Sequence, residues 1–163
     1  MRKRYLKGIT ALLLVFMLLP LKAWAAEAPE DADVVEMTPE EAEYYLGLYD
    51  MGSIEPRSSV FYNLTLGVLK EDEQLMVVYS TNTRETASEL GTKEIILEVK
   101  SGIFWLPVAT LEKSCYTNSR MHSGGFYYKN PTKGSTYRAT AIHYAIIGGK
   151  EYTSYASTNG TTF

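Results

Sequence analysis

The sequence predicts an all-β fold, an antiparallel β-sandwich of about seven strands preceded by one short helix. Two observations lead to this prediction. From residue 54 onward, short β-rich runs alternate with turn residues, and no alternation of strands with helices appears that would indicate a parallel sheet. The chain has 163 residues, 45% of them apolar, which suffices for one domain with its own core. The expected strands are 59–70, 74–83, 93–100, 103–112, 125–130, 136–147 and 150–157.

The first 25 residues, 1–25, form a segment of a different kind. A start with four basic residues and no acid is followed by the almost wholly apolar run 9–21, and then by Ala23 and Ala25. This order is typical of a secretory signal peptide. The apolar run is shorter than the roughly 20 residues that a membrane-spanning helix needs. We therefore expect cleavage after Ala25 and a secreted, extracellular product with no membrane attachment.

Charge is distributed unevenly along the chain. The whole chain has 16 basic and 19 acidic residues, a net charge of −3. Five of the bases lie in 1–25, so 11 bases and 19 acids remain after cleavage, a net charge of −8. This acidic balance argues against nucleic acid as a partner. Segment 26–37 is acidic and poor in large apolar residues, so we expect a flexible leader there.

Segment 38–52 carries the signature of a helix start. Thr38 can cap the helix, Pro39 suits the first turn, and Glu41 stands where a capping-box acid reaches back. Apolar and tyrosine residues follow at helical spacing, and Gly52 is a plausible end. We expect a short amphipathic helix here, followed by the β-domain at 54–163.

Turn residues delimit the expected strands. Residues 86–91 and Ser101-Gly102 separate three of them, and Gly148-Gly149 indicates a two-residue hairpin turn between the last two. The segment 114–124 is expected to be irregular. Strict alternation is clearest where Ile95 and Leu97 share one face of their strand.

Two stretches resemble fibronectin type III-like and Ig-like domains. Pro131, Gly134, Tyr137 and Ala141 follow the spacing of the approach to the sixth strand of such domains. The resemblance implies that Tyr137 is the corner tyrosine, whose hydroxyl bonds back to the backbone. It also implies that Trp105 is an aromatic residue of the core.

Over residues 60–163, four motifs follow one another: Ile95 with Leu97, Trp105 with Val108, Tyr137-Arg138 with His143-Tyr144, and a Ser/Thr-rich end at 153–162. Their order is similar to that in a family of small secreted proteins of Gram-positive bacteria. That family has no assigned activity. The similarity implies secretion and the fold, and supplies no catalytic residue.

Few residues offer catalytic chemistry. Cys115 is the one thiol, and His122 follows it by seven residues, so a Cys–His nucleophile pair stays open as an alternative to a buried apolar cysteine. His143 is expected at the rim of the core, with a catalytic role as the alternative. The sequence contains no closely spaced pair of His or Cys residues of the kind that indicates a metal site, so we predict no metal and no cofactor.

Tyrosine is unusually frequent, with 13 residues. Ile142 and Tyr144 lie opposite the Tyr137 face of their strand, and with Tyr127 and Tyr128 they are the expected binding surface for an extracellular protein or glycan. The sequence thus favours a secreted, non-catalytic binding module. Two alternatives stay open: a small extracellular enzyme using Cys115 or His143, and a structural envelope protein that self-associates through edge strands. The oligomeric state is not predicted.

Overall fold

The structure, a computed structural model, describes residues 34–49, 51, 54–56 and 58–163. The predicted all-β fold with one short helix is confirmed. The expected signal peptide and the first part of the leader, 1–33, lie outside the described residues. The elements are β1 (Val34–Glu36), α2 (Pro39–Leu48), β2 (Phe61–Glu71), β3 (Gln74–Ser101), β4 (Phe104–Tyr128), β5 (Thr136–Ile147), β6 (Lys150–Ser157) and β7 (Thr161–Thr162).

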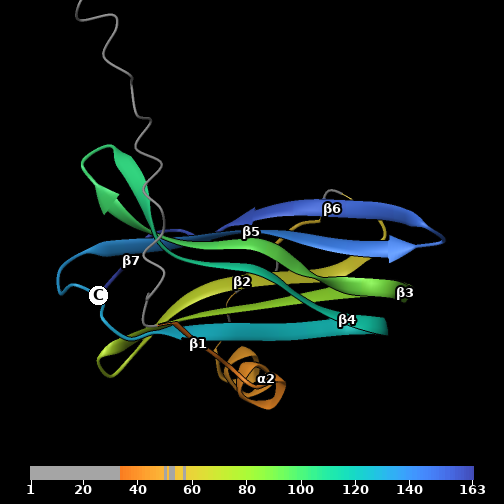
Figure 1. The fold of residues 1–163 in the computed structure, drawn as a ribbon, viewed down its shortest axis with the longest axis horizontal. Coiled ribbons are helices and arrows are strands. Elements are labelled where there is room, and N and C mark those ends of the chain that lie inside the picture. Colours follow the sequence, from red (N-terminus) through yellow and green to blue (C-terminus); the bar gives the residue numbers. More distant parts are fainter. Residues whose placement is uncertain (1–33, 50, 52–53, 57) are drawn as a thin grey trace, which may run out of the picture.

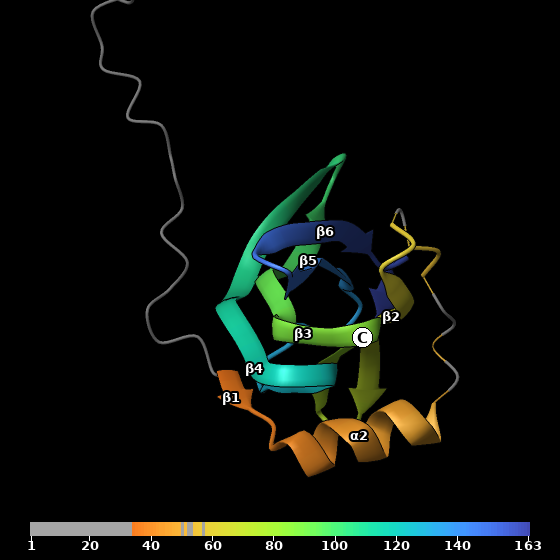
Figure 2. The same ribbon diagram turned by 90° about the vertical axis from the view of Figure 1, so that its right-hand side faces the viewer.

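β3 is a continuous strand that takes part in two layers. Its first half pairs with β2 and its second half with β5, while β4 runs antiparallel to it along almost its full length. The order of strands is β1-β4-β3-β5-β6, with β2 added on β3 and β7 on β5. The long β3–β4 pair bends, so the sheet folds over itself into a sandwich-like arrangement that the end-on view shows (Figures 1 and 2).

The division into strands differs from the prediction in two places. The expected turn at 86–91 and the expected irregular segment 114–124 are both strand, so 74–83 and 93–100 are one strand, and 103–112 and 125–130 are another. The bend in β3 is taken up by a register shift between Asn82 and Ala87, and the bend in β4 lies near Asn118, whose φ is 50°. Such bulges bend a strand without ending it. A bulge rich in polar residues looks the same in the sequence as a turn.

Two apolar cores lie between the layers, with a polar band between them. The larger core contains Val77, Leu97 and Phe126, and the smaller contains Phe61 and Leu90. Along each of three neighbouring strands, the inward-facing residues come in the same order. One lies in the smaller core, the next is polar, and the third lies in the larger core. The three sets are Leu90, Thr92 and Ile95 on β3; Ala145, His143 and Ala141 on β5; and Tyr152, Ser154 and Ala156 on β6.

The helix α2 begins at the predicted capping box. Thr38 Oγ1 accepts a hydrogen bond from the N–H of Glu41 at 3.3 Å, and Glu41 Oε2 accepts one from the N–H of Thr38 at 2.8 Å. The helix ends at Leu48, earlier than the expected segment 38–52. It covers Met76 and other apolar residues on the outer face of the layer that contains β2 (Figure 2).

The end of the expected leader is part of the sheet, so its predicted flexibility is wrong for these residues. Val34–Glu36 form β1, which pairs with Phe126–Tyr128 at the end of β4. Met37 is buried beside α2 and donates its N–H to the carbonyl of Gly125 at 2.9 Å. Backbone pairing and one buried methionine thus anchor a segment whose acidic composition suggested a solvated chain.

The predicted hairpin turn at Gly148-Gly149 is present. Both glycines have positive φ, 59° and 78°, and Ile147 pairs with Lys150 across them. A two-residue turn with left-handed backbone at both central positions matches the twist of the flanking strands. It joins β5 to β6 at the end of the molecule opposite the β3–β4 hairpin (Figure 1).

Candidate functional site

Tyr144, the centre of the predicted binding surface, is buried. Its exposed fraction is 2%, and the ammonium groups of Lys93 and Lys113 lie 5.3 and 5.4 Å from the centre of its ring. Its hydroxyl donates a hydrogen bond to Glu89 Oε1 at 2.8 Å. The expectation that Tyr144 lies on an exposed binding surface is therefore wrong, because charged side chains of neighbouring strands cover its ring.

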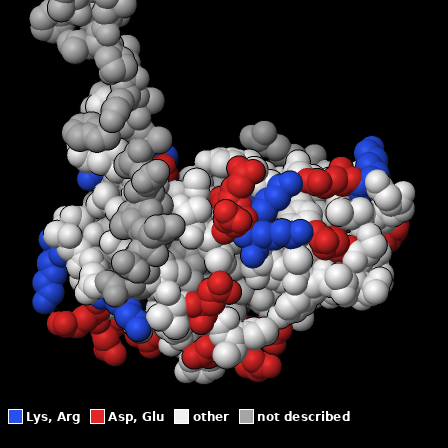
Figure 3. Space-filling model, viewed as in Figure 1, with Lys and Arg blue, Asp and Glu red and all other residues white. Residues whose placement is uncertain are grey.

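Ion pairs hold this cover in place. Lys113 Nζ lies 2.7 Å from Glu89 Oε1, and Lys93 Nζ lies 2.7 Å from Glu151 Oε1. Hydrogen bonds from Lys113 and Tyr144 lower the pKa of Glu89 below its usual range. The pKa of Tyr144 is raised far above its ordinary value, first by burial and then by the neighbouring Cys115 and Glu89. Acidic and basic side chains stand side by side on the face seen in Figure 3.

Of the other three predicted binding residues, Ile142 shares its face of β5 with Tyr144, whereas Tyr127 and Tyr128 lie elsewhere. Tyr127 is half-buried beneath α2, with its ring edge-on to Tyr45 at 6.4 Å. Tyr128 is half-buried on the opposite face of β4, where its ring lies 6.2 Å from that of Tyr137. Ile142 is half-buried on β5, opposite Lys93 and Tyr155 of the neighbouring strands. The four residues therefore occupy three separate environments.

The two residues assigned structural roles have different outcomes. Tyr137 is buried, and its hydroxyl accepts a hydrogen bond from the N–H of Thr132 at 2.8 Å, so the implied bond back to the backbone is present. Trp105 is only half-buried and lies outside both cores, so its expected place in the core is wrong. The guanidinium of Arg138 lies 4.5 Å from the Trp105 ring and pairs with Glu98 at 2.6 Å.

The two histidines are fully buried in the polar band, deeper than the core rim expected for His143. Thr81 Oγ1 lies 2.8 Å from His143 Nδ1 and 3.1 Å from the carbonyl oxygen of Gly91, within hydrogen-bonding distance of both. His122 Nε2 lies 3.0 Å from Ser114 Oγ. Burial lowers the pKa of each histidine to about 4, and the proximity of His122 adds to the effect on His143. Both rings are therefore neutral at neutral pH.

Cys115 forms no nucleophile–base pair with His143, nor with His122, whose Nε2 atom contacts Ser114, the neighbour of Cys115 on β4. Cys115 and Tyr144 both stand opposite Gly91, whereas Ser114 and His143 both stand opposite the next residue, Thr92. Because successive side chains of a strand point to opposite faces, the thiol and the imidazole lie on opposite sides of the sheet. In the described part of the chain, no group of three or more His, Cys, Asp or Glu side chains could hold a metal ion.

The β3–β4 hairpin carries a surface that the sequence analysis missed. Three large apolar side chains at its end, here called the apolar tip, are exposed: Ile103 by 87%, Phe104 by 65% and Leu106 by 49%. The hairpin stands away from the body of the molecule (Figure 1). The sequence feature that could have revealed this surface is the run of four apolar residues, 103–106, directly after Gly102. A two-stranded hairpin end cannot bury side chains on both faces, so some of them had to meet solvent.

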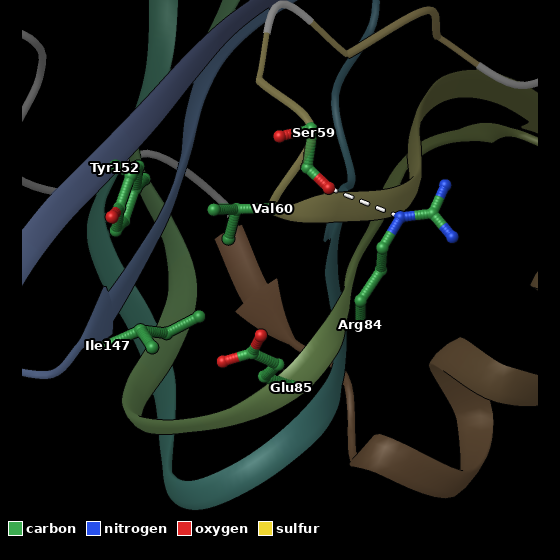
Figure 4. Close-up of a pocket in the computed structure, with 6 residues that line it drawn as sticks. All are labelled: Ser59, Val60, Arg84, Glu85, Ile147 and Tyr152. Carbon is green, nitrogen blue, oxygen red and sulfur yellow. Dashed lines mark hydrogen bonds between the residues drawn. The ribbon is translucent and has the colours of Figure 1, made fainter.

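A cavity of about 380 Å³ lies at the other end of the molecule. This end pocket is lined by Ser59, Val60, Arg84, Glu85, Ile147 and Tyr152 (Figure 4). Val60, Ile147 and Tyr152 pack against the smaller apolar core, so the floor of the pocket is apolar. Arg84 Nε donates to the carbonyl of Ser59 at 3.2 Å. Arg84 and Glu85 are both exposed and give the pocket a charged rim.

In the part of the chain that the structure describes, no helix has the length and apolar character that a bilayer crossing requires. No family model matches the chain, and no curated protein matches its sequence. Its function has to be inferred from the geometry of the described residues.

Proposed function

We propose that the protein is a secreted, non-catalytic extracellular module that binds a protein partner through its apolar tip. The export pattern of residues 1–25 supports secretion, and the observation that carries the binding role is the exposure of Ile103, Phe104 and Leu106 together. Contact with a partner would remove this apolar surface from water, at about 25 cal/mol per Å². The predicted role in binding thus moves from the Tyr144 face to the tip.

The chemistry of the tip favours a protein partner over a glycan. Aliphatic and phenyl groups without hydroxyls dominate it, whereas a sugar needs hydrogen-bonding side chains beside an aromatic face. Large apolar side chains such as phenylalanine are enriched in the cores of protein interfaces. The guanidinium of Arg138, which lies over the ring of Trp105 beside the tip, already pairs with Glu98.

The two alternative functions have weaker support. An enzyme based on Cys115 would need a base on the same side of the sheet, whereas His122 and His143 lie on the other side. The ring of His143 is fully buried, so no substrate reaches it in this structure. Self-association through edge strands is opposed on β4 by Pro107, which lacks an N–H, and by the bend at Asn118.

We further infer a relationship to fibronectin type III-like domains and to the family of small secreted Gram-positive proteins. The hydrogen bond between Thr132 and Tyr137 supports it. The long strands β3 and β4, which each run through both layers, differ from the separate strands that the resemblance implies.

Photo-crosslinking tests the binding role. A photo-crosslinking amino acid is introduced at Phe104 in the organism that produces the protein, with the same substitution at Tyr44, an exposed aromatic residue of α2, as the matched control. We expect a discrete protein adduct from position 104 and none from position 44. Equal or absent adducts at the two positions would contradict the proposal. The mass of the released protein tests export, since cleavage after Ala25 gives a chain that starts at Ala26.

A further inference from the structure

The apolar tip and the end pocket lie at opposite ends of the same layer. Val99, three residues before the bend of the tip at Gly102, pairs with Tyr137 at the start of β5. Ile147, which lines the pocket, ends the same strand. Ten residues of strand separate Tyr137 from Ile147, a distance of roughly 33 Å. The tip cannot reach the pocket of its own chain, and Figure 1 shows the two ends apart along the longest axis.

The tip and the pocket are complementary in shape. The tip is convex and presents the side chains of Ile103 and Phe104, the two most exposed of its members. The pocket is concave, and its volume of about 380 Å³ falls within the range of sites that enclose small organic groups. Its apolar walls, Val60 and Ile147, match the chemistry of a phenyl or aliphatic side chain.

Charge around the two surfaces is also compatible with contact. Lys100 is exposed beside the tip, directly across the hairpin from Trp105. Glu85 is exposed on the rim of the pocket, next to Arg84, whose Nε donates to the carbonyl of Ser59. A tip seated in the pocket brings an ammonium group toward a carboxylate, and such pairs at the rim of an interface influence orientation more than affinity.

We propose that the apolar tip of one molecule inserts into the end pocket of a second copy of the same chain. This inference rests on the proposed binding role of the tip and names its partner. Because the two surfaces differ and lie at opposite ends, each molecule keeps a free tip or a free pocket after one contact. Such a heterologous contact builds head-to-tail assemblies, either open chains or closed rings, and no symmetric dimer with one self-complementary interface.

The contact between tip and pocket is small, so we expect the association of two copies to be weak. A hairpin end covers less surface than the roughly 1,200 Å² of a stable interface. Association is therefore reversible and depends on protein concentration. Growth continues as long as both surfaces are intact.

Sedimentation with two complementary variants tests the proposal, using the protein as its producing cells make it. Phe104→Ser removes the largest side chain of the tip and leaves the pocket intact. Ser59→Trp fills the mouth of the pocket from an exposed position and leaves the tip intact. Ile147→Glu is a second pocket variant, and Tyr155→Ser is the control for loss of an exposed aromatic residue elsewhere.

We expect the average mass of the wild-type protein and of Tyr155→Ser to rise with concentration, while each tip or pocket variant stays monomeric. An equimolar mixture of Phe104→Ser and Ser59→Trp should form dimers and nothing larger, because one intact tip and one intact pocket remain. The Ile147→Glu variant should behave as Ser59→Trp does.

Three results would overturn the inference. Association of both pocket variants at wild-type strength would indicate tip-to-tip contact, and a mixture that stays monomeric would exclude the tip–pocket pair. A monomeric wild-type protein whose residue 104 still crosslinks to a different protein would overturn the second copy as partner and leave the proposed function standing.

Discussion

Thr81 and His143 lie in different layers of the sandwich, yet Thr81 Oγ1 and His143 Nδ1 are 2.8 Å apart. Thr81 belongs to the half of β3 that pairs with β2, and His143 belongs to β5, which pairs with the other half of β3. The bond links the layers within the polar band, where apolar packing is interrupted. The Nε2 atom of His143 has no hydrogen-bond partner among the described residues.

Acid should destabilise the protein in a defined range of pH. The pKa of His143 and of His122 is about 4 in the folded state, against about 6.5 in the unfolded chain. Between these values the unfolded state binds more protons, so stability is complete above pH 6.5 and falls as the pH drops toward 4. The loss is about 3 kcal/mol for each histidine.

Urea unfolding at a series of pH values measures this loss. The His143→Gln variant should be less stable than the wild type at pH 7. Between pH 6.5 and 4.5 it should lose less stability than the wild type, because it takes up about one proton fewer on unfolding and its unfolding free energy therefore falls less steeply with pH. Parallel curves for the two proteins would mean that carboxylates alone cause the acid sensitivity.

Tyr144→Phe should lower the free energy of unfolding by about 1–2 kcal/mol, because it removes a hydrogen bond to the carboxylate of Glu89 and keeps the buried ring. Tyr155→Phe on the adjacent strand is the matched control, since Tyr155 is exposed, and should change stability by less than about 0.5 kcal/mol. Chemical denaturation compares the two. Equal effects would show that the Tyr144 hydroxyl contributes nothing specific.

Gly91→Ala and Gly47→Ala should change the stability of the protein in opposite directions. A Cβ atom at Gly91 would lie 2.7 Å from Cys115 Cβ and closer still to the carbonyl oxygen of Ser114, so the strands β3 and β4 would have to separate. We expect a loss of at least about 2 kcal/mol there. Gly47, in α2, meets nothing within 4 Å, and alanine should stabilise the helix by up to about 1 kcal/mol. Thermal unfolding of both variants checks the pair.

Phe104→Ser should leave stability nearly unchanged, within about 0.5 kcal/mol, because the side chain is mostly exposed. Val77→Ala, in the larger core, should cost several times more. Urea unfolding distinguishes a tip that serves contacts with other molecules from one that supports the fold. A large loss for Phe104→Ser would assign it to the fold.

The features that could be predicted from sequence were those encoded locally. The capping box at Thr38 and Glu41, the turn at Gly148-Gly149 and the all-β class each depend on residues close together in the chain. The continuity of β3 through residues 86–91 could not be predicted in this way. Ala87 and Leu90 are both buried although they are three residues apart, so the segment lacks the two-residue alternation of a regular strand. Only its pairing with β4 and β5 identifies it as one.

The candidate site was mispredicted for a related reason. Tyr144 was correctly assigned to the face opposite Tyr137. The burial of its ring, however, depends on Lys93 of β3 and Lys113 of β4. Trp105 is assigned to the core by the resemblance to fibronectin type III-like domains, although a hairpin end has no second layer above it. Exposure is set by distant neighbours, which the spacing along one strand does not reveal.

The continuous β3–β4 pair also determines how the chain can fold. Pairing can begin at the turn beside Gly102 and extend outward, one residue pair at a time, until Leu75 meets Tyr128. β1, β2 and β5 then add to the edges of this pair, and β6 and β7 add to β5. A large loop-closure cost is thereby divided into small steps, although the final contacts are distant in sequence. The hairpin that carries the apolar tip is thus also the natural starting point of folding.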